Sequence, residues 1–149
     1  MKVLLVDDEP FILQGLSVLI DWAAEGCEIV KMASNGKEAL LYLEDHEADL
    51  VITDIKMPVM SGLELLEQIR GRQISDAFFI ILSGYNDFSY AQKAIRYACM
   101  DYLVKPVQKE ALLELIRKAK SSLAVTEQNA ENERRMQEMQ LKQYIIALL

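Results

Sequence analysis

Short apolar runs alternate with longer segments of helical periodicity over the first 120 or so of the 149 residues. This alternation is typical of βαβ units around a parallel sheet. Three of the runs are almost wholly apolar, which suits strands covered by helices on both faces. The runs are Val3–Val6, Glu28–Ala33, Leu50–Thr53, Phe78–Leu82 and Tyr102–Val104. We therefore predict a doubly wound, flavodoxin-like α/β fold with five parallel strands in the order 2-1-3-4-5.

Local signals mark where helices start between these runs. Pro10 suits a first helical turn, Ser34–Gly36 form a turn before a second helix, and Asn86–Asp87 can cap a fourth. Each predicted helix has an apolar stripe with which to cover the sheet. The stripes are Ile12, Leu16, Leu19 and Ile20; Ala39, Leu40 and Leu43; Leu63, Leu66 and Ile69; Ala91, Ile95 and Ala98; and Leu112, Leu115, Ile116 and Ala119.

Composition narrows the class of protein. The chain has 23 acidic and 16 basic residues, a net charge of −7, and no cluster of Lys and Arg. It therefore lacks the positive surface that nucleic acids and anionic membranes require. No apolar run reaches membrane-spanning length, and we expect no leader peptide. Cys27 and Cys99 lie far apart, and we expect a reduced, cytoplasmic protein in which they are not paired.

The composition changes after Ser122. Residues 126–135 are almost wholly polar yet contain neither Gly nor Pro, and the final LKQYIIALL is apolar. A heptad register started at Ile116 places Thr126, Glu133 and Gln137 at core positions, so a continuous coiled coil is weakly supported. We predict one domain over residues 1–122 and a C-terminal helical connector over 123–149. The apolar end either docks on its own domain or, as we favour, leads to a further domain absent from this chain.

Polar residues follow the predicted strands at one structural level. Asp7 and Asp8 end the first, Asp54 the third, Ser83 the fourth and Lys105 the fifth. Carboxyl ends of parallel strands meet at one edge of the sheet, where such folds bind ligands. Three carboxylates this close repel one another unless a cation joins them, and oxygen ligands of this kind suit Mg²⁺.

The same set of residues is suited to phosphoryl chemistry. A metal ion and an ammonium neutralise charge on the transferring oxygens, and a carboxylate can form an aspartyl phosphate. Asp54 stands alone on the central strand, whereas Asp7 and Asp8 are adjacent and better placed to share the metal. Asp54 is therefore the candidate nucleophile.

Four separated motifs resemble the receiver domain of bacterial two-component response regulators. They are VDDEP, DIKMPVMSGLELL around Asp54, LSGYND and DYLVKPV. The spacing agrees, since Ser83 lies 29 residues and Lys105 51 residues after Asp54. The resemblance covers roughly residues 1–122. It implies a phosphorylation-switched signalling protein, a phosphoprotein of a phosphorelay, rather than an enzyme acting on a metabolite.

The resemblance also implies roles for individual residues. Asp54 would accept a phosphoryl group from a sensor histidine kinase. Asp7 and Asp8 would hold Mg²⁺ together with Asp54 and the backbone carbonyl of Lys56, and Lys105 would contact the phosphoryl oxygens.

Two further positions correspond to the switch of that family. Ser83 matches its hydroxyl residue and Tyr102 its aromatic residue, and the Lys105–Pro106 bond is expected to be cis. A hydroxyl that moves toward the phosphoryl group vacates space into which an aromatic ring can turn.

The segment SGYNDFSYAQKAIRYACMDYLVKPV and the polar connector resemble the subgroup whose receiver precedes an AraC-type DNA-binding domain. This implies transcriptional regulation, with DNA bound only through an output domain that these residues lack. We also expect a homodimer through the receiver face, the connector helix or both.

Other interpretations stay open. The chain could act as a phosphorylation-independent dimerisation scaffold or, remotely, as a Mg²⁺-dependent phosphatase with an aspartyl intermediate. We expect Lys56 and Tyr85, at the mouth of the site, to change the lifetime of the phosphorylated state. His46 is interpreted as a solvated helix-end residue.

Overall fold

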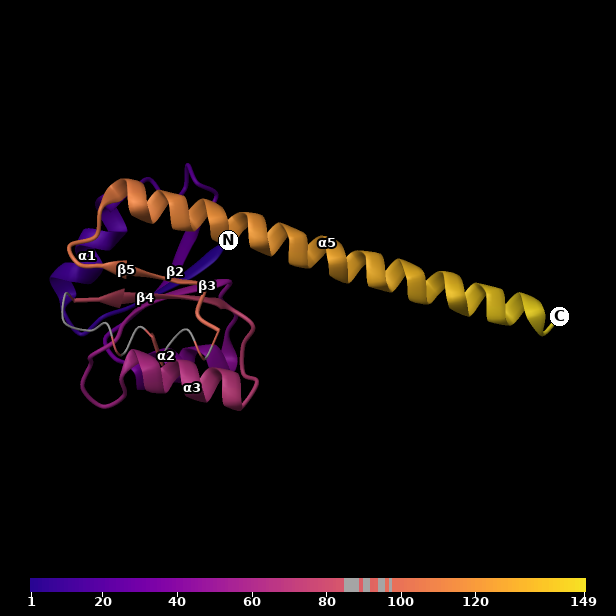
Figure 1. Ribbon diagram of the computed structural model, residues 1–149, viewed down its shortest axis with the longest axis horizontal. Helices are drawn as coiled ribbons and strands as arrows, with labels where there is room; N and C mark the ends of the chain where they lie inside the picture. The colour runs from indigo at the N-terminus through magenta and orange to yellow at the C-terminus, as the bar shows by residue number, and fades with distance from the viewer. Residues whose placement is uncertain (85–88, 90–91, 94–95, 97) are drawn as a thin grey trace. The chain divides into compact units, whose positions relative to one another are not determined.

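The computed structural model describes residues 1–84, 89, 92–93, 96 and 98–149. Its centre is a five-stranded parallel sheet in the order β2-β1-β3-β4-β5, which confirms the predicted fold class (Figure 1). The strands are β1 (Lys2–Val6), β2 (Glu28–Ala33), β3 (Leu50–Asp54), β4 (Phe78–Ser83) and β5 (Asp101–Val104). Each lies within one residue of its predicted run.

Helices cover both faces of the sheet. They are α1 (Pro10–Leu19), α2 (Gly36–Asp45), α3 (Gly62–Gly71) and α5 (Lys109–Ala147). Helix α1 and the first turns of α5 lie on one face, and α2 and α3 on the other (Figure 1). The predicted cap at Asn86–Asp87, and Ala91 and Ile95 of the predicted fourth stripe, lie outside the described residues.

Two of the predicted helix starts are confirmed. Pro10 occupies the first turn of α1, where a missing N–H costs nothing. Asn35 caps α2 by accepting a hydrogen bond from the Glu38 N–H at 2.8 Å. Ser61 caps α3 in the same way, accepting from the Glu64 N–H at 3.1 Å. These caps fix the points at which the chain turns from the sheet edge into each helix.

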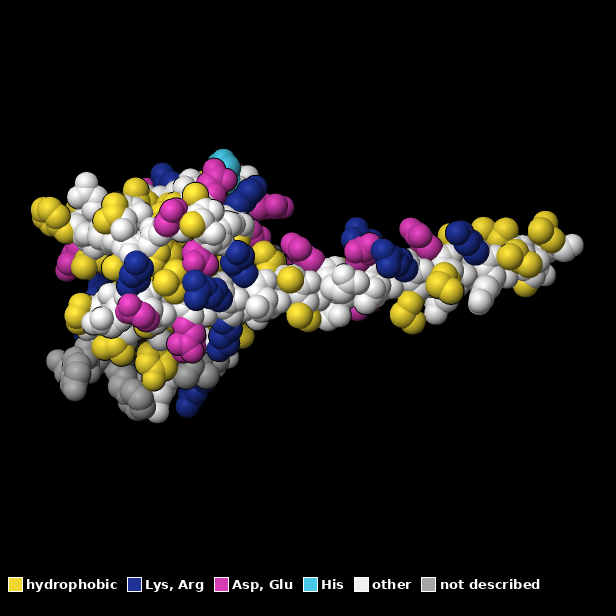
Figure 2. All heavy atoms as spheres, turned by 90° about the horizontal axis from the view of Figure 1, so that it is seen from above, with side chains coloured by type: hydrophobic (Ala, Val, Ile, Leu, Met, Phe, Trp, Pro, Cys, Tyr) yellow, Lys and Arg dark blue, Asp and Glu magenta, His cyan; other side chains and the backbone are white. Residues whose placement is uncertain are grey.

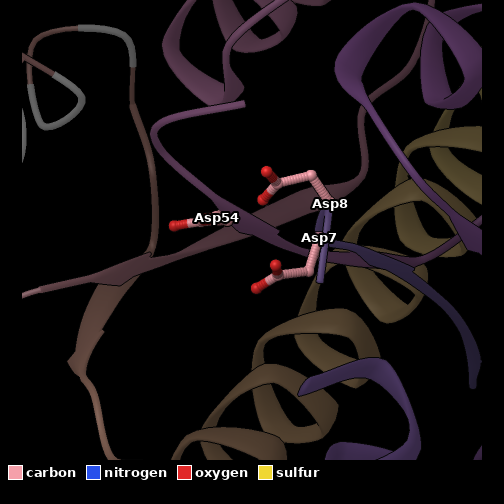
Figure 3. Close-up of side chains that lie close together, drawn as sticks. All are labelled: Asp7, Asp8 and Asp54. Carbon is pink, nitrogen blue, oxygen red and sulfur yellow. The ribbon is translucent and has the colours of Figure 1, made fainter. Parts of the chain in front are cut away.

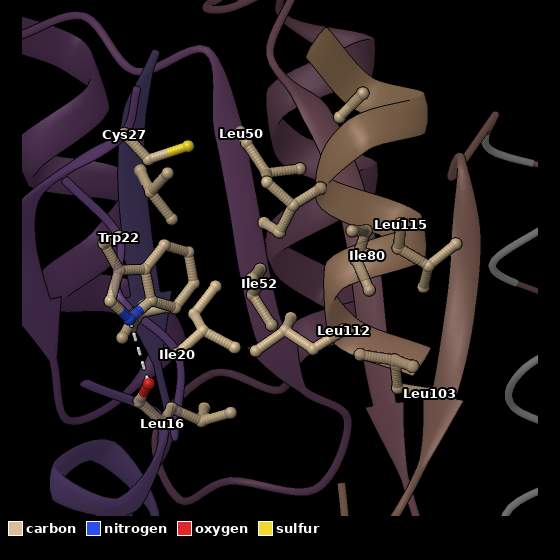
Figure 4. Close-up of a cluster of buried hydrophobic side chains, with 14 of the residues drawn as sticks. Leu16, Ile20, Trp22, Cys27, Leu50, Ile52, Ile80, Leu103, Leu112 and Leu115 are labelled. Carbon is tan, nitrogen blue, oxygen red and sulfur yellow. Dashed lines mark hydrogen bonds between the residues drawn. The ribbon is translucent and has the colours of Figure 1, made fainter. Parts of the chain in front are cut away.

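The core has two layers because side chains alternate along each buried strand. Val3 and Leu5 point into the cluster beneath α1 and α5, and Leu4 and Val6 into the cluster beneath α2 and α3. Trp22, the only tryptophan, is buried in the first cluster and donates from Nε1 to the Leu16 carbonyl at 3.0 Å (Figure 4). Its fluorescence therefore reports on the packing of this layer.

The chain divides into two compact units, Met1–Ala119 and Lys120–Leu149. Helix α5 runs through the boundary, and its fully or largely buried residues all precede residue 120. Residues 120–149 are helical to Ala147 and mostly exposed. No helix in the described part of the chain is both long enough and apolar enough to cross a membrane.

Val59, in the loop between β3 and α3, has a φ of 69° while its side chain is 75% exposed. The left-handed region is unfavourable for a β-branched residue, and no burial compensates here. Val59→Asn is therefore expected to raise the free energy of unfolding by about 1 kcal/mol, because Asn tolerates this conformation. Urea unfolding followed by Trp22 fluorescence measures the change.

The matched control is Val18→Asn, since Val18 is 79% exposed in the helical conformation of α1. It removes an equally exposed valine without relieving strain and is expected to leave stability within about 0.5 kcal/mol. Equal changes in the two variants would contradict the assignment of strain to Val59.

Candidate functional site

Three carboxylates meet at the carboxyl edge of the sheet. Asp7 and Asp8 directly follow β1, and Asp54 is the last residue of the neighbouring β3. One oxygen from each lies within 4.8 Å of the others, and Figure 3 shows the three side chains gathered at this edge. Asp7 is fully buried and Asp54 is 8% exposed, whereas Asp8 faces solvent. The structure thus brings together the carboxylates that strand topology predicted.

Lys105 reaches this cluster from the end of β5, two strands away from β3. Its Nζ lies 3.1 Å from Asp7 Oδ2 and 3.3 Å from Asp54 Oδ2. The Lys105 backbone N–H donates to the Ser83 carbonyl at 2.8 Å, which joins the ends of β4 and β5. The Lys105–Pro106 peptide bond is cis, as expected. Burial alone would lower the pKa of Lys105. The hydrogen bond from its ammonium to Asp7 and the negative charges of Asp54 and Asp7 together raise it by more than burial lowers it, so the net shift is upward.

The pKa of Asp54 is raised from 3.8 to about 6. Burial is the main cause and the Asp7 carboxylate adds to it, while Lys105 and the Ile55 N–H, which donates at 2.9 Å, act in the opposite direction. With Asp8, the site holds three carboxylates against one ammonium. The site therefore has excess negative charge and only oxygen ligands, and this cluster could hold a hard divalent cation such as Mg²⁺.

Gly62, at the start of α3, lets that helix approach the backbone of Asp54. Its N–H donates to the Ile55 carbonyl at 2.8 Å. A Cβ at this position would lie 2.0 Å from the Asp54 carbonyl oxygen, which no real contact allows. Sequence reasoning missed this residue, although a glycine beginning a helix just after the candidate nucleophile was a usable signal. Gly62 therefore positions the main chain that carries Asp54.

A cavity of about 510 Å³ opens beside Asp8. Its lining comes from Asp8, from the β3–α3 loop and from the first turn of α3, and includes Lys56, Ser61 and Glu64. The side chain of Lys56 is exposed. Lys56 thus lines the same cavity as Asp8, while its predicted role as a carbonyl ligand stays a prediction. Ser61 and Glu64 were not among the predicted site residues.

The two predicted switch residues lie on adjacent strands. Ser83 is buried at the end of β4, and Tyr102 on β5 is 40% exposed and pairs in register with Ile81. Their roles stay predictions, and Tyr85 lies outside the described residues. His46 is exposed at the end of α2, where its ring stacks on Tyr42 at 4.5 Å between centroids. It is a helix-end residue, as interpreted from sequence.

The raised pKa of Asp54 lowers the free energy of unfolding as the pH rises from 3.8 to about 6. Between pH 3.8 and about 6 the unfolded chain releases the Asp54 proton before the folded chain does, so folding is opposed as the pH rises. Asp54→Asn is expected to exceed wild type in free energy of unfolding by about 1–3 kcal/mol at pH 7.5 without divalent ions, and to match it near pH 3.8. Urea unfolding in EDTA across this pH range measures the difference.

Asp45→Asn is the control, because it removes the same charge from an exposed position at the end of α2. It is expected to follow wild type throughout the titration. A stability difference between wild type and Asp54→Asn that does not change with pH would show that the Asp54 charge is not its source.

Comparison with known proteins supports the family that the four sequence motifs resemble. The family model described as the response regulator receiver domain matches residues 3–117. The uncharacterized transcriptional regulatory protein YesN of Bacillus subtilis is 39% identical over 112 residues, 75% of this chain and 30% of YesN. The transcriptional regulatory protein HptR of Staphylococcus aureus (strain N315) is 42% identical over 115 residues, 77% of this chain and 44% of HptR.

Solved structures agree with the fold. The REC domain of AraT, a response regulator from Geobacillus stearothermophilus, superposes with a TM-score of 0.78 at 39% identity, covering 85% of this chain and 97% of that one. The two component transcriptional regulator AraC from Clostridium phytofermentans gives 0.75 at 28% identity, covering 83% and 95%.

The chain spans less than half the length of these curated relatives. The matched segment contains β1 from Val3 onward and the other four strands whole, together with Asp7, Asp8, Asp54, Ser83 and Lys105. The family resemblance seen in the four sequence motifs is thereby confirmed: this chain belongs to the response regulator receiver domain family.

Proposed function

We propose that this chain is a phosphorylation-switched receiver in which Asp54 accepts a phosphoryl group from a sensor histidine kinase. The observation that carries this proposal is a nearly buried Asp54 with Lys105 Nζ at 3.3 Å and two further carboxylates within reach of a shared cation. Asp7, Asp8 and Asp54 would hold Mg²⁺, and the bound ion would neutralise charge on the transferring oxygens.

In the proposed transfer, a carboxylate oxygen of Asp54 forms the new O–P bond. The P–N bond of the phosphohistidine breaks, and its electron pair stays on the imidazole. The Lys105 ammonium lies beside Asp54 and is available to donate to the phosphoryl oxygens as charge builds on them. Asp54 is only 8% exposed, so little of the acceptor is open to bulk water.

Phosphorylation would then act through the ends of β4 and β5. A phosphoryl group adds charge and acceptor oxygens beside Ser83, whose carbonyl already bonds the Lys105 N–H. Movement of the Ser83 hydroxyl toward it would leave room for the half-exposed ring of Tyr102. The phosphoryl group biases this equilibrium through its differential contacts with the two packings.

The output we propose is transcriptional regulation, because YesN and HptR are named as transcriptional regulators. The net charge of −7 is unfavourable for binding the phosphates of DNA. DNA binding would therefore belong to a domain beyond these 149 residues, in a cytoplasmic protein.

The test is incubation with acetyl phosphate and Mg²⁺, followed by intact mass. Wild type is expected to gain one phosphoryl group, and Asp54→Ala or wild type in EDTA none. A gain that Asp54→Ala retains would contradict the assignment of the acceptor. No gain on wild type would favour the scaffold interpretation, and steady release of inorganic phosphate from an added phosphomonoester would favour the phosphatase.

A further inference from the structure

Leu141, Ile145 and Leu148 are exposed apolar residues near the C-terminal end of α5, and their spacing continues back along the helix to Leu123. Positions on one helix face recur at intervals of three, four and four residues, an eleven-residue repeat. They are Leu123, Thr126, Ala130, Arg134, Gln137, Leu141, Ile145 and Leu148, and we call them the eleven-residue face. This period of about 3.67 residues per turn matches a nearly straight α-helix, whereas a heptad register drifts off it. It accounts for the failure of the heptad test on the same segment.

The eleven-residue face is exposed where it is most apolar. Leu141 is 59%, Ile145 50% and Leu148 69% exposed. Figure 2 shows apolar side chains gathered toward the C-terminal end of α5 and charged ones along its middle. Aliphatic side chains at this spacing on a polar helix are typical of a surface that packs against a second helix.

We propose that the occupant is a second copy of this chain, packed antiparallel across the eleven-residue face. A two-fold axis between Arg134 and Gln137 places Leu123 opposite the partner's Leu148 and Ala130 opposite the partner's Leu141. In the second pair the small Ala130 meets the larger Leu141, a combination that fills a helix interface. The central layer pairs Arg134 with the partner's Gln137, whose amide oxygen can accept from the guanidinium.

Charge complementarity selects the antiparallel arrangement. In an antiparallel pair, residues that border one side of the eleven-residue face meet residues that border the same side of the partner's face; we call this border the flank. Arg134 then lies level with the partner's Glu138. On that flank Lys142 falls between the partner's Glu127 and the partner's Glu131. The two-fold axis repeats each of these three contacts, so six pairs of opposite charges border the interface, against the two like-charge pairs that Glu131 makes with the partner's Glu138.

A parallel pair on the same face is disfavoured by charge. It would place Arg134 directly against the partner's Arg134, because equal residue numbers lie at equal heights. The opposite flanks would then meet, bringing Glu133 near the partner's Glu138. Like charges facing each other across an interface weaken it. Orientation is therefore specified by a few charged residues near the middle of the segment.

The test is sedimentation equilibrium of the whole 149-residue chain. Wild type is expected to be a dimer, and Ile145→Glu to raise the dimer Kd roughly 100-fold or more, because each copy then carries an unpaired carboxylate into the interface opposite the partner's Thr126. Met139→Glu is the matched control: Met139 is 61% exposed on the opposite side of the same helix, and this variant is expected to remain dimeric. Unchanged Trp22 fluorescence would show that the receiver stays folded in both.

Two charge variants test the orientation. Glu138→Arg places a second guanidinium against the partner's Arg134 in the antiparallel pair and is expected to weaken the dimer about tenfold. Combining it with Arg134→Glu restores opposite charges and is expected to recover the affinity. A tighter Glu138→Arg dimer would indicate the parallel pair and overturn the proposal. So would a monomeric wild type, a dimer that Ile145→Glu leaves intact, or one that only Met139→Glu disrupts.

Discussion

Lys105→Met is expected to slow the phosphorylation of Asp54 by acetyl phosphate by about 100- to 1,000-fold. The Lys105 ammonium lies 3.1 Å from Asp7 and 3.3 Å from Asp54 and is the one side-chain cation that the described structure pairs with either carboxylate. Methionine keeps the unbranched stem but leaves nothing to stabilise charge on the transferring oxygens. The initial rate of mass gain at saturating Mg²⁺ measures the effect.

Two companion variants make this result specific. Lys118→Met removes an ammonium from an exposed pair, 3.5 Å from Asp101, and is expected to phosphorylate at the wild-type rate. Lys105→Arg keeps a cation at the site and is expected to recover part of the rate. Equal rates in Lys105→Met and wild type would show that the Lys105 ammonium takes no part in the transfer. Trp22 fluorescence reports whether each variant is folded.

Gly62→Ala is expected to lower the free energy of unfolding by about 3 kcal/mol or more and to impair phosphorylation of Asp54. The added Cβ would lie 2.0 Å from the Asp54 carbonyl oxygen and 3.1 Å from the Thr53 hydroxyl. The first of these atoms is backbone within a central strand and cannot rotate away. Either α3 must shift away from β3 or the Asp54 backbone must be displaced, and both disturb the geometry around the Asp54 carboxylate. Urea unfolding and the rate of mass gain measure the two effects.

Gly15→Ala is the control for helix propensity. Nothing lies within 4 Å of a Cβ at Gly15, which is inside α1. Alanine is the better helix former there and is expected to stabilise by about 0.5–1 kcal/mol. If Gly62→Ala shared this gain, the close approach of α3 to Asp54 would be disproved.

The fold could be predicted from sequence because its signals are local and repeated. Each strand is a short apolar run, and caps such as Asn35 act within three residues. Parallel topology then determines where strand ends lie, so Asp7, Asp54 and Lys105 could be placed together from the sequence alone. The eleven-residue repeat is equally present in the sequence, but a heptad register does not detect it.

Features that depend on atomic distances could not be predicted in the same way. The glycine at position 62 is a signal of close approach, but the sequence does not say that the atom approached is the Asp54 carbonyl oxygen. The left-handed conformation of Val59 contradicts its own local preference and is imposed by the loop that joins β3 to α3. The degree to which Asp54 loses contact with water, which sets its pKa, also emerges only from packing.

The placement of the single tryptophan has a spectroscopic consequence. Trp22 is buried in the Met1–Ala119 unit, and Lys120–Leu149 contains none. Fluorescence therefore follows the unfolding of the receiver, whereas far-UV ellipticity combines the receiver with a long additional stretch of helix. The two signals are expected to melt at different temperatures whenever residues 120–149 fray first, and a two-state analysis then applies to the fluorescence alone. Any comparison of thermal stability between variants of this chain has to state which chromophore it observes.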